Sequence, residues 1–110
     1  MPVYEFSSFR LEPDKCRLLQ GAEPVPLTAK AFDTLVALVE NRDRVMEKGD
    51  LLREVWPDTI VEESNLSQNV FMLRKALGDS PEGARFIATI PKRGYRFVAD
   101  VRVMPDDGGA

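Results

Sequence analysis

The sequence of 110 residues predicts a single α+β domain. Three observations lead to this fold class. Short apolar bursts separated by turn formers occupy the first quarter of the chain, three stretches with helical periodicity follow, and two β-prone stretches flank a Pro-Lys-Arg-Gly turn near the C-terminus. Apolar residues make up 44% of the chain and charged residues 30%, which is the balance of an ordinary soluble globular protein.

Residues 3–26 are expected to form an antiparallel meander of four short strands. The apolar bursts are interrupted at Ser7-Ser8, Pro13-Asp14 and Gly21-Ala22, which are typical turn residues. This segment contains no constellation of catalytic type, so its expected role is to provide a surface on which the helices pack.

Two helices are predicted after the meander. Thr28 is the expected N-cap of the first, which should end near Asn41. The second spans residues 48–56 and is closed by Pro57. Its entry is poorly capped, because Glu47 is not a favoured N-cap residue.

The third helix, Ser64 to Leu77, is the segment around which the rest of the chain is organised. Its apolar stripe has steps of four, three and four residues, and Gly78 follows as a stop signal; the stripe is Leu66, Val70, Leu73 and Leu77. The opposite face carries amides and a hydroxyl in place of the usual Glu and Lys. Its expected members are Ser64, Asn65, Gln68, Met72 and Lys75, with Asn69 and Phe71 on the flanks. Amides both donate and accept hydrogen bonds, as base edges in a DNA major groove require. An ordinary amphipathic helix is the alternative, and Phe71 is expected to pack in the core or between subdomains.

The C-terminal part predicts a β-hairpin. Residues 86–90 and 95–98 are the expected strands, and Gly94 is expected in a left-handed turn position beside Lys92 and Arg93 at the tip. Three helices followed by a hairpin with a basic tip form a winged helix-turn-helix. The expected domain spans residues 1–104, and residues 105–110 have the composition of a linker or tail.

The distribution of charge along the chain is more informative about a binding partner than the net charge of −3. Residues 1–63 hold 8 Lys/Arg and 13 Asp/Glu, whereas residues 64–98 hold 6 and 2, a balance of +4. A basic end on an acidic body is a pattern that orients a protein on nucleic acid.

Composition also excludes several classes of function. The single Cys16 rules out an internal disulfide and fits a reducing compartment, so a cytoplasmic location is expected. Without His, a metal site has almost no ligands, and no cofactor is expected. The chain lacks a nucleophile–base pair and a phosphate-binding glycine loop, so it is not expected to be an enzyme. No apolar run is long enough to span a bilayer.

Four motifs together resemble the OmpR/PhoB-type winged-helix DNA-binding domain over about residues 3–102. They are Leu27-Thr28 with Phe32 and Leu35, Leu51-Leu52 with Val55-Trp56, Leu73-Arg74-Lys75-Ala76-Leu77, and Gly94-Tyr95-Arg96-Phe97. The resemblance implies a bacterial transcriptional regulator whose third helix enters the major groove of double-stranded DNA while the wing reaches the minor groove.

The resemblance also implies roles for individual residues. The expected base-contacting residues are Ser64, Asn65, Gln68, Asn69 and Met72. The expected contacts to the DNA backbone or minor groove are Lys48, Trp56, Arg74, Lys75, Thr89, Lys92, Arg93 and Tyr95. The loop before the third helix is the expected contact for RNA polymerase, through Ile60, Val61, Glu62 and Glu63. Dimerisation on DNA is expected by the same analogy.

The position of the domain suggests a longer protein. Because the domain starts at Met1, it resembles the arrangement of CadC/ToxR-like regulators, in which a membrane segment or sensory module follows it.

Alternatives remain for several of these residues. The spacing of Asn65 and Gln68 also fits a capping box, Trp56 fits the core, and the loop with Glu62 and Glu63 fits a solvated connector. The competing function is a winged helix that binds another protein without binding DNA.

Overall fold

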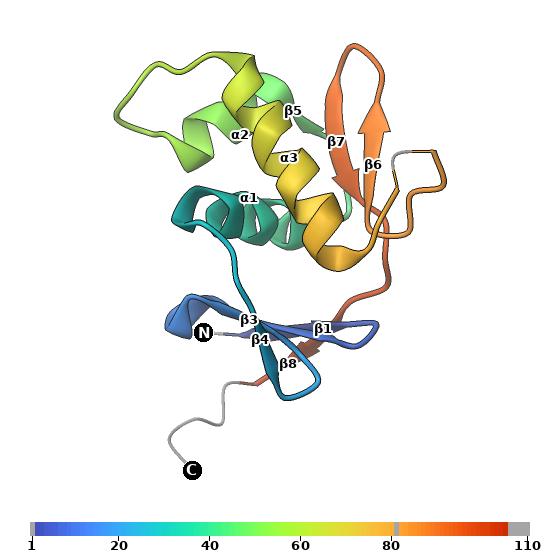
Figure 1. Ribbon diagram of the computed structural model, residues 1–110. Helices are drawn as coiled ribbons and strands as arrows, with labels where there is room; N and C mark the ends of the chain where they lie inside the picture. The colour runs from blue at the N-terminus through green and yellow to red at the C-terminus, as the bar shows by residue number, and fades with distance from the viewer. Residues whose placement is uncertain (1, 81, 106–110) are drawn as a thin grey trace.

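A computed structural model describes residues 2–80 and 82–105 of the chain. A five-stranded sheet forms one end of the molecule, and α1 lies nearest to it among the three helices (Figure 1). A hairpin stands beside the third helix towards the other end. The elements in chain order are β1 (Val3–Phe6), β2 (Phe9–Glu12), the 3-10 turn η1 (Pro13–Lys15), β3 (Arg17–Gln20), β4 (Glu23–Val25), α1 (Ala29–Glu40), β5 (Met46–Glu47), α2 (Lys48–Val55), α3 (Glu63–Leu77), β6 (Ile87–Ile90), β7 (Gly94–Phe97) and β8 (Arg102–Met104).

The predicted α+β architecture is confirmed, including the four-stranded N-terminal meander and the C-terminal hairpin. Two strands were not expected. β8 returns to pair antiparallel with β1, which gives the order β4-β3-β2-β1-β8, and the two residues of β5 pair with β7. Of the expected tail, residues 105–110, all but Pro105 lie outside the described part of the chain. None of the helices within the described ranges has the length and apolar character needed to cross a membrane.

A cluster of aromatic rings joins the sheet to the base of the hairpin. The ring centroids of Phe6 and Phe97 are 4.9 Å apart, those of Phe6 and Phe86 5.9 Å, and those of Phe9 and Phe86 5.7 Å. All three pairs are edge-to-face, the geometry that the ring quadrupoles favour. The N-terminal sheet therefore supports the hairpin as well as the helices.

The predicted helix ends are largely confirmed. The backbone N–H of Ala31 donates to Thr28 Oγ1 over 3.2 Å, so Thr28 is the N-cap of α1. No side chain caps the start of α2 after Glu47, as its sequence indicated. Gly78 ends α3 with a φ of 73°, a left-handed conformation that glycine adopts without strain.

The prediction for Gly94 is wrong. The left-handed residue of the hairpin turn is Lys92, with a φ of 63°. Gly94 is needed for a different reason, because the backbone of β5 passes directly over it. A Cβ at this position would collide with the carbonyl group of Met46 and would lie 2.9 Å from the Cα atom of Glu47. Glycine therefore allows β5 and β7 to pair.

Asp79 organises the loop that connects α3 to the hairpin. Its Oδ1 atom accepts hydrogen bonds from the backbone N–H groups of Ser80 and Arg85, and its Oδ2 atom accepts from those of Phe86 and Ile87, over 2.8–3.1 Å. Partial burial alone would raise the pKa of this carboxyl, but the four donors outweigh that effect and hold its pKa below the ordinary value. The charged carboxylate thus stabilises the start of β6.

We predict that Asp79→Asn lowers the free energy of unfolding by about 1–3 kcal/mol at neutral pH, because an amide cannot accept from all four donors. A carboxylate with a lowered pKa stabilises the fold above its unfolded-state pKa and loses this effect as the pH falls through its folded-state pKa. The difference between the two proteins should therefore shrink below about pH 4. Urea denaturation at several pH values measures this difference in the free energy of unfolding. Asp43→Asn, in an exposed turn, is the control, and an equal loss in both variants would contradict the role of Asp79.

Candidate nucleic-acid interface

α3 presents a continuous exposed stripe on the side away from the core. Leu66, Val70, Leu73 and Leu77 are buried as predicted. Two residues before each of them stand Ser64, Gln68, Phe71 and Lys75, all of which are exposed. Two helical residues span about 200°, so a stripe displaced by two positions lies on the opposite face. In Figure 1, α3 crosses in front of α1, and its outer side is not covered by another element.

Phe71 belongs to this exposed stripe, and the expectation that it packs in the core is wrong. Its side chain is 60% exposed. The spacing of residues 64, 68, 71 and 75 repeats the steps of the buried stripe and contained the signal that places Phe71 outside. The prediction that Phe71 is buried came from its aromatic side chain, because large apolar rings are usually found in the core.

Asn69 is also placed differently from the expectation. Its side chain is only 7% exposed, and its Nδ2 atom donates to Thr34 Oγ1 on α1 over 3.2 Å. The Thr34 hydroxyl in turn donates to the carbonyl oxygen of Lys30 over 2.7 Å. Asn69 links α3 to α1 inside the protein, so its predicted place on the groove-facing side is wrong.

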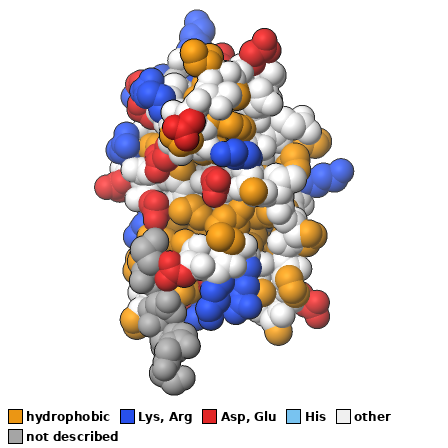
Figure 2. All heavy atoms as spheres, turned by 90° about the vertical axis from the view of Figure 1, so that its left-hand side faces the viewer, with side chains coloured by type: hydrophobic (Ala, Val, Ile, Leu, Met, Phe, Trp, Pro, Cys, Tyr) orange, Lys and Arg blue, Asp and Glu red, His pale blue; other side chains and the backbone are white. Residues whose placement is uncertain are grey.

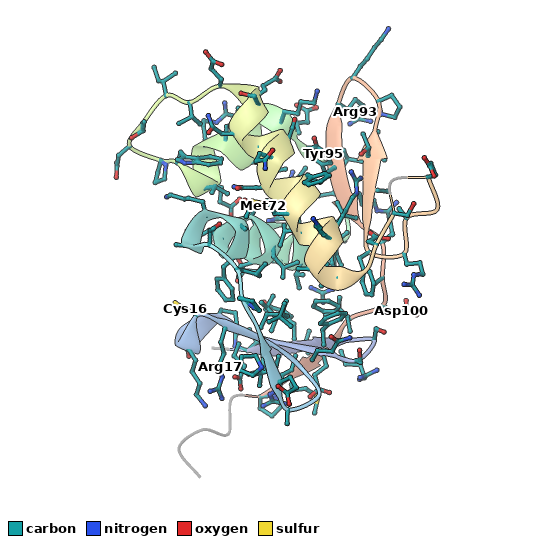
Figure 3. The ribbon with its side chains drawn as sticks, viewed as in Figure 1. Cys16, Arg17, Met72, Arg93, Tyr95 and Asp100 are labelled. Carbon is teal, nitrogen blue, oxygen red and sulfur yellow. The ribbon has the colours of Figure 1, made fainter. Side chains whose placement is uncertain are left out.

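The capping-box alternative for Asn65 and Gln68 is not what the structure shows. α3 begins at Glu63 with Glu62 as its N-cap residue, so Asn65 already lies inside the first turn. The Asn65 amide approaches the carbonyl oxygen of Glu62 at 3.4 Å, and both Asn65 and Gln68 are exposed. Met72 lies at the edge of this face and is half-buried (Figure 3).

Arg74 connects α3 to the hairpin. Its Nη2 atom donates to Thr89 Oγ1 over 2.7 Å and to the carbonyl oxygen of Ile87 over 3.0 Å, and its Nε atom also donates to the latter. Two residues that were expected to hold DNA phosphates are thus hydrogen-bonded to each other. Lys75, the next residue of α3, points to solvent.

The hairpin carries its basic residues at and near the tip. Lys92 and Arg93 are exposed, and Arg93 lies at the end of the hairpin beside α3 in Figure 3. An Arg93 guanidinium nitrogen is 3.9 Å from a carboxylate oxygen of Glu47, a distant ion pair on the surface. Lys48 is close to the same turn, because its backbone N–H donates to the carbonyl oxygen of Arg93 over 3.1 Å. Tyr95 is only 6% exposed and packs in the core.

The loop between α2 and α3 projects on another side of the molecule. Ile60 is fully exposed, whereas Val61 is half-buried, and Glu62 and Glu63 are exposed. An open pocket of about 450 Å³ lies between this loop and α2, with Trp56 in its wall. The Trp56 ring is half-buried, and the Nζ atom of Lys30 lies 5.9 Å from its centroid. Figure 2 looks onto this side and shows hydrophobic side chains gathered across the middle of the face, with both acidic and basic side chains around them.

Apart from Glu63 at the start of α3, the charged side chains of α3 and the hairpin are all basic. After Glu63, α3 contains no acidic residue, and it carries Arg74 and Lys75 in its last turns. The hairpin adds Lys92, Arg93 and Arg96, all exposed. The hydrogen bonds of Arg74 fix the hairpin beside α3, on the half of the molecule away from the N-terminal sheet (Figure 1). The structure therefore brings the polar stripe and the basic hairpin together.

Sequence comparison relates the chain to transcriptional regulators. Residues 22–97 match the family model described as transcriptional regulatory protein, C terminal. The chain is 29% identical over 101 residues to the transcriptional activator CadC of Escherichia coli, covering 91% of this chain and 20% of that protein. It is 34% identical over 101 residues to the transcriptional regulator HilA of Salmonella typhi, covering 92% and 18%. The chain thus spans about a fifth of the length of these curated relatives.

Solved structures confirm the winged-helix fold. The DNA-binding domain of E. coli CadC has a TM-score of 0.79 at 26% identity, covering 93% of this chain and 96% of that one. The DNA-binding domain of Klebsiella pneumoniae RstA, solved in complex with the RstA box, has a TM-score of 0.76 at 24% identity, covering 87% and 96%. The predicted resemblance to OmpR/PhoB-type domains is also confirmed.

We predict that Arg74→Met loosens the hairpin and lowers the free energy of unfolding by about 1–3 kcal/mol, because the carbonyl oxygen of Ile87 and the hydroxyl of Thr89 lose their donors. Hydrogen exchange of the β6 amides and urea denaturation measure the two effects. Arg53→Met is the control, since Arg53 is exposed and forms an ion pair with Asp50 on its own helix. Unchanged exchange in β6 of the Arg74 variant would contradict the proposed link.

Proposed function

Because this chain belongs to the family of transcriptional regulatory protein C-terminal domains, of the OmpR/PhoB type, we propose that it binds double-stranded DNA sequence-specifically within a bacterial transcriptional regulator. α3 enters the major groove, and the tip of the β6–β7 hairpin reaches the neighbouring minor groove. The observation that carries this proposal is the exposed polar stripe of α3 lying beside a basic hairpin.

The relatives support the proposal. The CadC structure is described as a DNA-binding domain, and the RstA domain was solved with its DNA box. This chain shares their fold, and its α3 carries no acidic side chain after Glu63. The diameter of an α-helix matches the width of the major groove.

Within this proposal the exposed residues take the roles that their chemistry allows. Ser64, Asn65 and Gln68 contact base edges, and Met72 makes an apolar contact at the edge of the groove. Asn69 is left out, because its amide is used inside the protein. Contacts to phosphates and the minor groove come from the exposed Lys75, Thr89, Lys92 and Arg93 and from the half-buried Lys48, Trp56 and Arg74. Tyr95 reaches a phosphate through its hydroxyl alone, because its ring is buried. Arg74 and Thr89 also orient the hairpin, and the buried Tyr95 ring supports it from below.

Further partners form part of the proposal. The fully exposed Ile60 and its neighbours Val61, Glu62 and Glu63 form a surface for RNA polymerase, and dimerisation on DNA extends the number of base pairs that are read. The rest of the longer protein supplies a sensory or membrane module, and the domain works in the cytoplasm, where the bacterial chromosome lies. Phosphate contacts supply most of the affinity, which makes binding strongly dependent on salt.

Removing the basic tip should weaken binding to all DNA sequences alike. We predict that Lys92→Ala/Arg93→Ala reduces the slope of log K against log salt by about 2, close to one for each phosphate that is no longer neutralised. Titration of labelled duplex DNA at several salt concentrations measures this slope. Lys15→Ala/Arg102→Ala removes the same charge from η1 and β8, at the end of the molecule that holds the N-terminal sheet, and should leave the slope unchanged. Absence of salt-dependent binding in the native protein would refute DNA binding and favour the alternative, a protein–protein module.

Gln68 should contribute to specificity rather than to general affinity. We predict that Gln68→Ala costs about 1–3 kcal/mol of binding free energy on the cognate site, selected from a random pool, and that this loss disappears when the base pair read by Gln68 is replaced. Affinities for a set of single-base-pair variants measure the effect. Gln20→Ala, an exposed amide on β3, is the control. A variant that loses stability but keeps its sequence preference would show a structural role for Gln68.

A further inference from the structure

Phe71 is the one phenylalanine that the fold does not bury. Five of the six phenylalanines of the chain lie in the core, at most 7% exposed, whereas Phe71 is 60% exposed. It lies in the middle of the exposed stripe of α3, three residues after Gln68 and four before Lys75. Each of these steps is about one helical turn, so the three side chains lie in a row.

The surroundings of this ring favour a negatively charged, grooved partner. The neighbouring exposed side chains on its face are a hydroxyl, an amide and an ammonium group, without a carboxylate. The exposed Lys92, Arg93 and Arg96 of the hairpin lie on the same half of the molecule. An apolar ring within a polar and cationic surface fits a polyanion that presents an apolar group between hydrogen-bonding edges.

The DNA major groove presents one such group. The C5-methyl of thymine is the only apolar group among the base edges there, and a side chain without hydrogen-bonding atoms can distinguish bases only through it. We propose that Phe71 contacts the methyl group of a thymine and thereby selects an A·T pair; this inference rests on the proposed DNA binding. A helical turn advances about 5.4 Å and a base pair about 3.4 Å, so this thymine lies one or two base pairs from the base read by Gln68.

Met72 is the competing apolar residue. It is half-buried at the edge of the face, whereas the Phe71 ring projects from the middle of it. The structure therefore assigns the methyl contact to Phe71, and Met72 serves as the matched control.

The test removes the methyl group alone. Deoxyuridine has the hydrogen-bonding groups of thymidine but lacks the methyl, so each thymine of a selected site is replaced by uracil in turn. At one position, uracil should weaken binding of the native protein about fourfold, the change expected for one buried methyl group. Phe71→Ala should bind the two duplexes equally. Met72→Ala removes a different proposed groove contact and so changes the overall affinity, but it should keep the fourfold difference between the two duplexes. Because the Phe71 ring is mostly exposed, thermal unfolding of the Phe71 variant should match that of the native protein.

The outcomes separate this inference from the proposed function. Salt-dependent DNA binding with the same response to uracil in the native and Phe71→Ala proteins overturns the thymine contact and leaves DNA binding intact. An unchanged affinity for DNA in Phe71→Ala, together with loss of self-association or of a protein partner, overturns it in favour of a protein interface. Failure of the native protein to bind any duplex overturns both.

Discussion

The burial of one stripe of α3 determines which side chains the domain presents. Leu66, Val70, Leu73 and Leu77 are removed from water against the neighbouring helices, and the residues two positions earlier must then face outward. The hydrogen bond between Asn69 and Thr34 adds an angular constraint. A rotation of α3 about its axis would leave a buried amide without a partner, which costs more than an ordinary hydrogen bond contributes. Hydrophobic burial thus holds the helix in place, and one buried polar pair fixes its rotation.

The hairpin depends on α3 in turn. Arg74 reaches across to β6, Asp79 gathers the backbone donors at the start of that strand, and the phenylalanine rings below join the hairpin to the N-terminal sheet. The pairing of β5 with β7 adds a connection to α2. These contacts come from four separate parts of the chain and converge on a hairpin of eleven residues, 87–97. If DNA binds as proposed, a surface held this way would lose little conformational entropy on binding, so more of the contact energy would appear as affinity.

The sequence predicted correctly those parts of the fold that depend on interactions between residues close together in the chain. The cap at Thr28, the glycine stop at Gly78 and the apolar stripe of α3 each depend on residues within one or two turns. The errors arose where a distant segment decides. Asn69 is buried because its amide donates a hydrogen bond to the Thr34 hydroxyl on α1. Gly94 is required because the backbone of β5 packs against it, and β8 forms because it pairs with β1 at the edge of the N-terminal sheet. Phe71 differs, because periodicity placed it outside and only the usual preference of aromatic rings for the core argued otherwise.

A chain with a net charge of −3 can bind a polyanion if its charges are far enough apart. The domain extends 43 × 33 × 24 Å, and charges in physiological salt are largely screened beyond about 8 Å. The acidic surplus lies within residues 1–63, which form the N-terminal sheet, α1, α2 and the loop before α3. Residues 64–98, with α3 and the hairpin, carry the basic surplus. DNA at α3 would therefore experience mainly the local positive charge, while the acidic body would repel it from the wrong faces. In the proposed binding mode, the arrangement of charge, and not its sum, would govern the orientation in which DNA approaches.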